Sequence, residues 1–338
     1  MQDFGNPLSK KMMELISARW TSQALSVIAE LRVADFLKDG PLSVEDLAAR
    51  TQTHADSLFR FLRALASEGI FEQLEDQRFK LTPLGDTLRG DVPGSARPLA
   101  MSLGRPWNND SWQQALHSVR TGEPAIRKAL GRGLFEYLSE HPEQYQEFSE
   151  AMTGAARIMH TAAIKAYDFS GIGTLVDVGG GHGWLLGSIL REYPSMKGHL
   201  YDRPHVVAGA RGNLEGLGVL ERCTLSGGDF FVSVPQGADA YIISNVIHNW
   251  GDTHALQLLK NCRAASRAGG RLIILDGVIR PGNEPDYGKR LDLQMLVCTE
   301  GRERTAQEYE RLCREAGFSL QRVIPTPSSV SIVEAVAV

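Results

Sequence analysis

Closely spaced glycines after a strand-like run are the first feature with chemical meaning. The segment Val176-Asp-Val-Gly-Gly-Gly-His-Gly-Trp has glycines at 179, 181 and 183, between a predicted strand and a predicted helix. Glycine permits tight turns and lets a ligand approach the backbone without an intervening Cβ. Asp202 ends the next predicted strand, where a carboxylate can accept hydrogen bonds from ribose hydroxyls. The pattern predicts a site for a nucleoside-bearing cofactor; a tight turn with a capping acid is the plainer alternative.

The spacing of these glycines disfavours a dinucleotide. The fingerprint G-x-G-x-x-G requires its third glycine three positions after the second, and this chain has Trp184 there. A nicotinamide or flavin cofactor is therefore the weaker interpretation.

A histidine with possible catalytic use follows another strand-like run. His248 comes a short loop after the predicted buried strand 241–244, on the carboxyl edge where α/β sheets bind ligands. Histidine, with a pKa of ~6.5, can accept a proton from a hydroxyl such as a phenol, with a pKa of ~10. Two acids near predicted element ends have plain structural uses: Asp276 could cap a turn, and Glu303 could cap the helix that begins near Thr305. The other histidines show no metal-binding spacing, so we expect no metal, and we expect His160, on a covering helix beside Met159, to be a surface or packing residue.

Short apolar runs alternating with helices must position these residues. The runs 174–178, 199–201, 240–243 and 271–275 predict a parallel sheet wound on both faces. Two last strands, near 319–325 and 330–338, follow a helix over 305–316 and are expected to pair with each other at one edge.

The N-terminal region predicts one or two amphipathic helices over 8–37 and then a winged helix. Ser43 can cap a helix over 44–50, a second helix spans about 54–67, and two β-like pieces follow. The segment from Pro41 to Gly90 holds eight acids and six bases, the reverse of a DNA-binding footprint. A structural or dimerising module is therefore favoured over DNA binding.

The length and composition of the chain limit the number of domains and the classes of partner. A chain of 338 residues suits two domains, and 36 basic against 40 acidic residues leave no broad basic surface for nucleic acid or anionic lipid. The first twenty residues lack a signal-peptide core, no apolar stretch is long enough for a membrane helix, and four scattered cysteines are typical of reduced thiols. We expect a cytoplasmic protein with a helical N-terminal domain (1–95), a helical connector that covers a pocket (96–166) and a catalytic α/β domain (167–338).

Six motifs in order carry a resemblance that covers nearly the whole chain. They are Asp177-Val-Gly-Gly-Gly-His-Gly, Tyr201-Asp-Arg-Pro, Gly228-Asp-Phe-Phe, His248-Asn-Trp, Asn261-Cys-Arg and Gly301-Arg-Glu-Arg-Thr. Together they resemble the S-adenosylmethionine-dependent small-molecule O-methyltransferases. The resemblance implies a Rossmann-like class I methyltransferase domain after a mainly α-helical winged-helix dimerisation domain. It also implies a homodimer that methylates an aromatic small molecule in secondary-metabolite or antibiotic biosynthesis.

The same resemblance assigns roles to individual residues. Gly179 would face the amino-acid part of the cofactor, Asp202 the ribose, and Asp229 with Phe230 the adenine. His248 would be the general base, supported by Asp276 and Glu303. Further cofactor-binding positions are Asp177, Gly181, Arg203, Gly228 and Ser244, the last at a position that is often basic in the family. The acceptor pocket would be bordered by Trp107, Phe148, Met152, Met159, Asn249 and Met295, for which ordinary core packing is the alternative.

Two other functions stay open at this point. The family commonly has Asp after the histidine, and this chain has Asn249. A neutral amide can only hydrogen-bond there, which leaves room for a relative that binds the cofactor but performs hydroxylation, decarboxylation or a pericyclic reaction. The third function is a metabolite-sensing regulator whose winged helix binds DNA.

Overall fold

The computed structural model describes residues 6–338, apart from the side chains at positions 155 and 158. It divides into two compact units. The first contains the chain up to Asp110 together with Phe135–Ala156, and the second contains Ser111–Leu134 together with Arg157–Val338. The expected connector, 96–166, is thus shared between both units.

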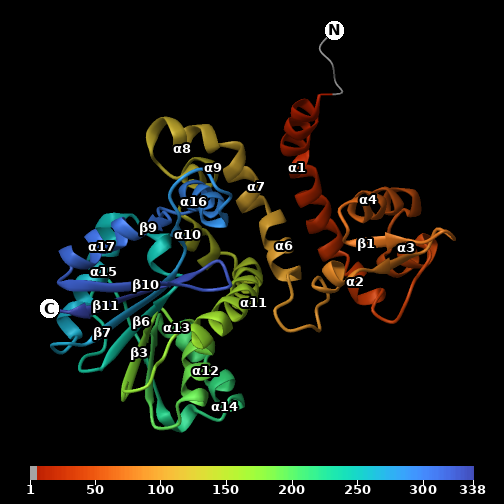
Figure 1. The fold of residues 1–338 in the computed structure, drawn as a ribbon. Helices are drawn as coiled ribbons and strands as arrows, with labels where there is room; N and C mark the ends of the chain where they lie inside the picture. The colour runs from red at the N-terminus through yellow and green to blue at the C-terminus, as the bar shows by residue number, and fades with distance from the viewer. Residues whose placement is uncertain (1–5) are drawn as a thin grey trace. The chain divides into compact units, whose positions relative to one another are not determined.

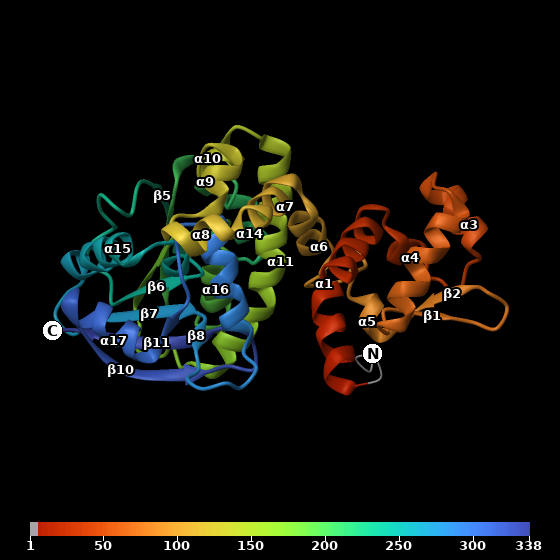
Figure 2. The ribbon, with the colours of Figure 1, turned by 90° about the horizontal axis from the view of Figure 1, so that it is seen from above.

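The first unit is helical with one small hairpin, as the sequence predicts (Figures 1 and 2). Ser43 caps α3 by accepting a hydrogen bond from the Asp46 N–H at 3.1 Å, and Gly69 ends the turn after α4 with a φ of +75°. The strands β1 and β2 pair antiparallel. The elements wholly within this unit are α1 (Pro7–Glu30), α2 (Val33–Phe36), α3 (Val44–Thr51), α4 (Ala55–Ser67), β1 (Phe71–Gln73), β2 (Phe79–Leu81), α5 (Pro83–Asp86) and α6 (Arg97–Gly104).

Five helices follow, and three of them cross the boundary between the units. The two that belong wholly to the second unit are α8 (Ala115–Thr121) and α9 (Ala125–Leu130). Those that cross are α7 (Pro106–Gln113), α10 (Leu134–Ser139) and α11 (Pro142–Ala166).

The second unit is built on a seven-stranded sheet with the order β10-β11-β7-β6-β3-β4-β5. Strands β3 to β7 are parallel, while β11 runs antiparallel to both β7 and β10. The predicted pairing of the last two strands is confirmed, with β10 at the edge. The strands are β3 (Thr174–Val178), β4 (Lys197–Asp202), β5 (Cys223–Gly227), β6 (Ala240–Ser244), β7 (Arg271–Asp276), β10 (Phe318–Pro325) and β11 (Ser331–Ala337). The sequence predicted all of these strands except β5.

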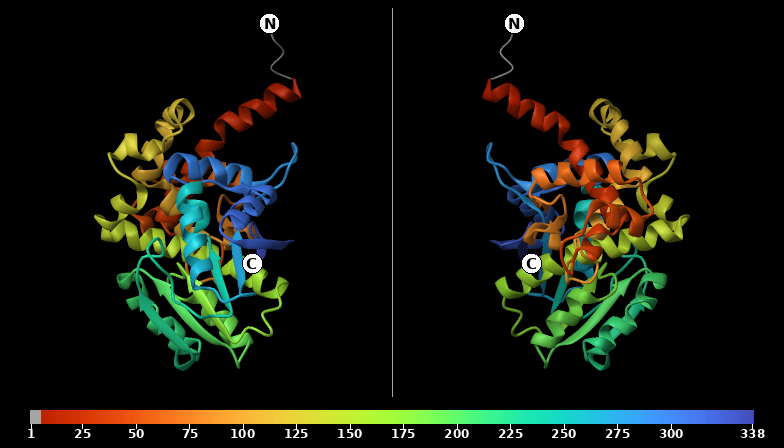
Figure 3. Two further views of the ribbon diagram at one scale, coloured as in Figure 1. Left: turned by 90° about the vertical axis from the view of Figure 1, so that its left-hand side faces the viewer. Right: turned by 90° about the vertical axis from the view of Figure 1, so that its right-hand side faces the viewer.

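Alternate residues of each strand supply two separate cores, which is why helices cover both faces (Figures 1 and 3). Helices α15 and α17 pack on one face and α12 and α14 on the other. The helices of this unit are α12 (Trp184–Glu192), α13 (Pro204–Ala208), α14 (Arg211–Gly216), α15 (Asp252–Ala265), α16 (Tyr287–Cys298) and α17 (Ala306–Glu315), with short 3₁₀ turns η1 (Leu220–Arg222) and η2 (Ile247–Asn249). A two-stranded parallel pair, β8 (Val278–Ile279) and β9 (Arg304–Thr305), stands apart from the main sheet.

The strand order reverses between β3 and β6. From β3 the chain moves outward through β4 and β5, and then returns to β6 on the other side and continues to β7. Open α/β sheets bind ligands at the carboxyl ends of the strands at such a reversal. The glycine loop follows β3 and the His248 segment follows β6, so both predicted sites lie at this point.

Candidate active site

The glycine loop has the backbone that its sequence predicts. Gly179, Gly181 and Gly183 have φ angles of +71°, +57° and +74°, which L side chains rarely adopt. The Gly179 N–H donates to the Tyr201 carbonyl at 2.8 Å, and the Gly181 N–H donates to Oδ2 of Asp202 at 2.8 Å. A Cβ at position 181 would meet nothing within 4 Å, so this side of the loop is open.

The Gly228-Asp-Phe segment lies against the same loop. The Gly228 N–H donates to the Asp202 carbonyl at 2.9 Å, and a Cβ placed on Gly179 would lie 3.7 Å from the Phe230 ring and 2.7 Å from Val246. Residues predicted to contact three parts of the cofactor are therefore brought together. Arg203 has an exposed side chain, and its N–H donates to Oδ1 of Asp202 at 2.7 Å.

Asp177 lies beneath the loop. Neither of its carboxylate oxygens has a hydrogen-bond partner, and a Cβ on Gly180 would approach its Cγ to 2.5 Å. Burial, reinforced by the negative charge of Asp202, raises the pKa of Asp177 to about 7. Its place under the backbone indicates support for the loop, and its predicted cofactor contact stays a prediction.

His248 is held by Glu303. Its Nδ1 lies 2.8 Å from Oε1 of Glu303, and both side chains are buried. This contact leaves Nε2 for another partner. The alternative that Glu303 caps α17 is wrong, because Thr305 and Glu308 form the capping box of that helix.

The segment 301–305 also fixes the loop that carries His248. A Cβ on Gly301 would lie 1.9 Å from the His248 carbonyl, and the Arg302 N–H donates to that carbonyl at 2.9 Å. The guanidinium of Arg304, fully buried, donates to the Trp250 carbonyl at 2.8 Å and pairs with Asp252 at 2.9 Å. Arg304 lies in the Gly301 motif, but its side chain gave no signal that it would support this loop.

The charge of His248 depends on two acids. Burial alone would lower its pKa, but the nearby Asp276 and Glu303 outweigh burial and raise the pKa to about 9. Burial raises the pKa of Asp276 to about 7, against the opposing charge of His248. Asp276 ends β7 with its carboxylate fully buried, and its negative charge is one of the causes that raise the pKa of His248.

The side chain of Asn249 forms a hydrogen bond with the backbone of its own loop. Its Nδ2 donates to the Asn245 carbonyl at 3.0 Å, and Asn245 has a left-handed φ of +52°. A carboxylate at position 249 could not donate this bond. The departure from Asp thus has a local structural reason.

Ser244 contacts a histidine that the sequence reasoning expected to be a surface or packing residue. His160 is 8% exposed, and its Nε2 lies 2.9 Å from the Ser244 hydroxyl. Nothing in the sequence indicates that a histidine on a helix contacts the end of a strand 84 positions later.

The residues expected around the acceptor fall into two groups. Trp107 and Phe148 belong to the first unit with Met152, and their rings meet edge to face with centroids 6.0 Å apart. Met159, Asn249 and Met295 belong to the second unit, where Met295 is buried. Their role at an acceptor stays a prediction.

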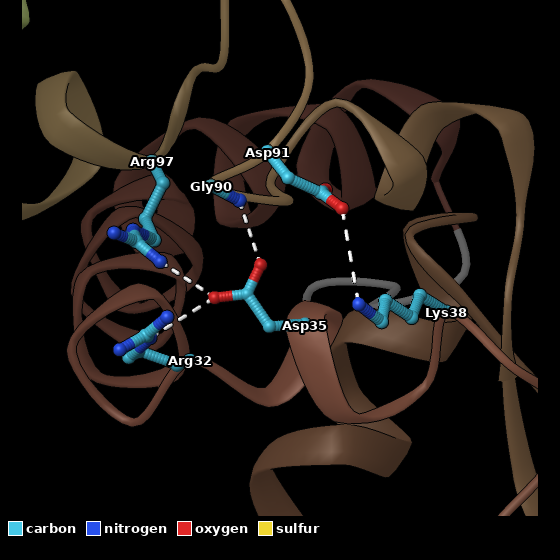
Figure 4. Close-up of a pocket in the computed structure, with 6 residues that line it drawn as sticks. All are labelled: Arg32, Asp35, Lys38, Gly90, Asp91 and Arg97. Carbon is cyan, nitrogen blue, oxygen red and sulfur yellow. Dashed lines mark hydrogen bonds and ion pairs between the residues drawn. The ribbon is translucent and has the colours of Figure 1, made fainter.

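The structure also has cavities that His248 does not line. One of about 240 Å³ in the first unit is lined mainly by charged side chains that form ion pairs with one another (Figure 4). Asp35 accepts hydrogen bonds there from the Gly90 N–H at 2.7 Å and from Arg97 at 2.6 Å. Another, about 510 Å³, is open and lies over β4 and β5, and its lining includes Gly228 and Asp229, which the sequence predicts to bind the cofactor. Neither has the paired acid and base found at His248.

Comparison with known proteins decides the family. An O-methyltransferase domain model matches residues 112–319, and an O-methyltransferase dimerisation domain model matches residues 13–91. The chain belongs to the S-adenosylmethionine-dependent O-methyltransferase family. The expected fold, a class I methyltransferase domain after a helical dimerisation domain, is confirmed, and the enzyme is an S-adenosylmethionine-dependent methyltransferase.

Similar proteins come from antibiotic and phenazine metabolism. The enzyme is 44% identical to a phenazine O-methyltransferase of Lysobacter antibioticus, with 97% of this chain and 96% of the relative covered. It is 30% identical to the phenazine-1-carboxylate N-methyltransferase of Pseudomonas aeruginosa, with 97% of each covered. It also matches a crystal structure of an O-methyltransferase from neocarzinostatin biosynthesis in complex with S-adenosylmethionine and 2-hydroxy-5-methyl naphthoic acid, with a TM-score of 0.81, 32% identity and coverage of 94% and 96%.

The residues of this methyltransferase fit its cofactor. The Gly181 side of the loop is open, Asp202 accepts a hydrogen bond from that loop, and the Phe230 ring lies beside Gly179, all near the strand reversal. Within residues 6–338 there is no group of three or more His, Cys, Asp or Glu side chains that could hold a metal ion. In the same range, no helix combines the length and hydropathy needed to cross a membrane.

Proposed function

We propose that the enzyme methylates a hydroxyl of an aromatic small molecule in secondary-metabolite biosynthesis, with His248 as the general base. The observation that carries the proposal is the contact of His248 Nδ1 with Glu303, which directs Nε2 toward another partner. An aromatic amine loses its proton only after it gains the methyl group, so such a base would contribute less to N-methylation. The geometry therefore favours oxygen as the acceptor atom.

Three protein residues have distinct roles in the proposed reaction. S-adenosylmethionine supplies an electrophilic methyl group, and the protein must align an oxygen with it. His248 accepts the hydroxyl proton at Nε2, while Glu303 holds Nδ1 and, with Asp276, stabilises the imidazolium that forms. The raised pKa of His248 approaches the ~10 of a phenol, which makes proton transfer nearly balanced.

The acceptor class comes from the relatives. The relatives include a phenazine O-methyltransferase, a mitomycin biosynthesis 6-O-methyltransferase and a 3-amino-4-hydroxybenzoate 4-O-methyltransferase, and the neocarzinostatin enzyme was solved with a naphthoic acid. We propose a fused or substituted hydroxyarene of antibiotic or phenazine biosynthesis. Nothing in the structure favours the non-methylating or DNA-binding alternatives over methyl transfer.

A matched pair of acceptors tests the proposal. The enzyme would be mixed with methyl-labelled S-adenosylmethionine and with phenazines and naphthoates that carry either a hydroxyl or an amino group at the same position. We expect label in the hydroxyl compounds and little in the amines. Methylation of the amines alone, at a rate that does not depend on His248, would refute the assignment.

We also propose a homodimer formed through the N-terminal domain. Helix α1 exposes a row of large apolar side chains between Leu8 and Trp20, among them Met12 and Ile16, and the match to a dimerisation domain begins at residue 13. Sedimentation should give twice the chain mass for the wild type and a lower mass for Trp20→Glu. A monomeric wild type at micromolar concentration would contradict this state.

A further inference from the structure

A buried histidine at the end of β6 has no role in the proposed reaction. His160 lies on α11, it is 8% exposed, and its Nε2 is 2.9 Å from the Ser244 hydroxyl. Its other ring nitrogen, Nδ1, is buried and has no hydrogen-bond partner among the residues that the structure describes. A buried polar atom without a partner is costly, so it is expected to have one in the working enzyme.

The hydrogen bonds at Ser244 are compatible with one tautomer of His160 that makes its free nitrogen a donor. The amide of Asn245 donates to the Ser244 hydroxyl oxygen at 3.3 Å, and the hydroxyl hydrogen is available to Nε2 of His160; we take this arrangement, and the ¹⁵N measurement below tests it. With Nε2 as an acceptor, Nδ1 carries the ring hydrogen and is a donor. Burial lowers the pKa of His160 to about 4, so the ring is neutral at pH 7.

The surroundings of His160 favour a negative partner for this donor. Arg157 lies one turn earlier on α11, with its guanidinium carbon 4.0 Å from the centre of the Trp184 ring and its Nε buried without a partner. Trp184 is the first residue of α12, and no side chain caps that helix. Free N–H groups at a helix start favour an anion. Arg157 thus lies beside the start of the helix that follows the glycine loop, and His160 lies one turn further along α11, against the end of β6.

We propose that His160 is a cofactor-binding residue whose Nδ1–H donates to the carboxylate of the amino-acid part of S-adenosylmethionine, with Ser244 holding the ring in this tautomer. The expected cofactor role of Ser244 then becomes indirect, through His160. The inference rests on the cofactor site of the proposed function and is independent of the acceptor that is methylated.

Two substitutions separate the ring nitrogens. In His160→Asn the amide nitrogen can take the place of Nδ1, while in His160→Gln it can take the place of Nε2 only. The probes are S-adenosylhomocysteine, which has the amino-acid part, and 5′-methylthioadenosine, which lacks it. We expect His160→Gln to weaken S-adenosylhomocysteine binding by about 10-fold or more, the loss typical of a hydrogen bond to a charged group, with methylthioadenosine within about 2-fold. His160→Asn should retain most of the affinity.

A second histidine-serine pair supplies a matched control. His199 Nε2 lies 2.6 Å from the Ser226 hydroxyl on β5. His199→Gln should leave the ratio of the two affinities unchanged, as measured by titration calorimetry. An equal loss for both probes in His160→Gln would overturn the proposal, because it would show a general structural role. Unchanged S-adenosylhomocysteine binding, or an equal loss in His160→Asn, would also overturn it.

A measurement on the wild type keeps the proposal testable if the variants fail to fold. With ¹⁵N-labelled histidine, the His160 ring should show a protonated Nδ1, and S-adenosylhomocysteine should shift that signal while methylthioadenosine does not. A protonated Nε2, or equal shifts with both probes, would overturn the proposal. A wild type that binds S-adenosylhomocysteine but methylates no hydroxyarene would refute the proposed function and leave this inference intact.

Discussion

Two buried histidines flank the segment that follows β6, and their surroundings give them opposite charge behaviour. His160 meets the neutral Ser244 at the end of the strand, and burial lowers its pKa to about 4. His248 meets Glu303 a few residues later, and Asp276 and Glu303 raise its pKa to about 9 despite burial. Both side chains are more than nine-tenths buried.

The difference shows that neighbouring carboxylates, and not burial, decide what each histidine can do. A neutral ring with no acid nearby is a fixed donor and cannot collect a proton near pH 7. A ring beside two acids can collect a proton and hold it. We therefore infer that one side of this segment binds the cofactor and the other moves the proton of the acceptor.

The largest effect should come from removing the ring of His248. His248→Ala is expected to lower the rate of methyl transfer by about 10²- to 10⁴-fold, the usual contribution of a positioned general base. Binding of S-adenosylhomocysteine should stay within about 2-fold, because His160 and the glycine loop are untouched. Rates with labelled cofactor and calorimetric affinities would measure both.

If His248→Ala lowered the cofactor affinity as much as the rate, His248 would not act on the proton alone, and the separate roles of the two histidines would be contradicted. His160→Gln serves as the opposite variant, in which the affinity for the cofactor falls.

The second effect concerns pH. The raised pKa of His248 favours the protonated ring, so the neutral base appears, and kcat/KM rises, as pH increases through the folded-state value near 9. Glu303→Gln removes one of the two negative charges, so the pKa of His248 falls toward or below the ordinary ~6.5. We expect the rise in kcat/KM to begin at least about one pH unit lower, with a plateau about 10-fold below the wild type.

His160→Gln is the control for the pH profile, because His160 has no carboxylate near it and its pKa lies far below the assay range. Its profile should keep the wild-type shape. A profile in Glu303→Gln that does not move, or moves to higher pH, would show that Glu303 does not set the charge of His248.

Much of the fold could be predicted from the sequence because its signals are local. The glycines at 179, 181 and 183 require positive φ angles wherever they occur, and apolar runs of five residues between helices indicate buried parallel strands. The strand β5 was missed because Cys223–Gly227 is short, half-exposed and only weakly apolar. Weak strands at sheet edges lack the pattern on which such reasoning depends.

The parts of the site that escaped prediction depend on contacts between distant segments. The contact of His248 with Glu303 spans 55 positions, and that of His160 with Ser244 spans 84. The family resemblance predicted a role for Glu303. It gave no role to Arg304, although Arg304 lies in the same motif, and none to His160. Burial and partners of a polar residue are set by the packed fold, so only the structure could show that Arg304 supports the His248 loop.

The smallest effect tests the residue beside the base. Asn249→Asp replaces the amide that donates to the Asn245 carbonyl with a carboxylate. The carboxylate and the carbonyl are both acceptors and repel each other, in a loop whose residue Asn245 has a left-handed φ. We expect a loss of about 1 kcal/mol in the free energy of unfolding, a fall in Tm of ~2–4 °C and a few-fold lower rate. Asn249→Ala removes the bond without the repulsion and should lose less. If Asn249→Asp were faster than the wild type with an unchanged Tm, the amide would be limiting the base and not supporting its loop.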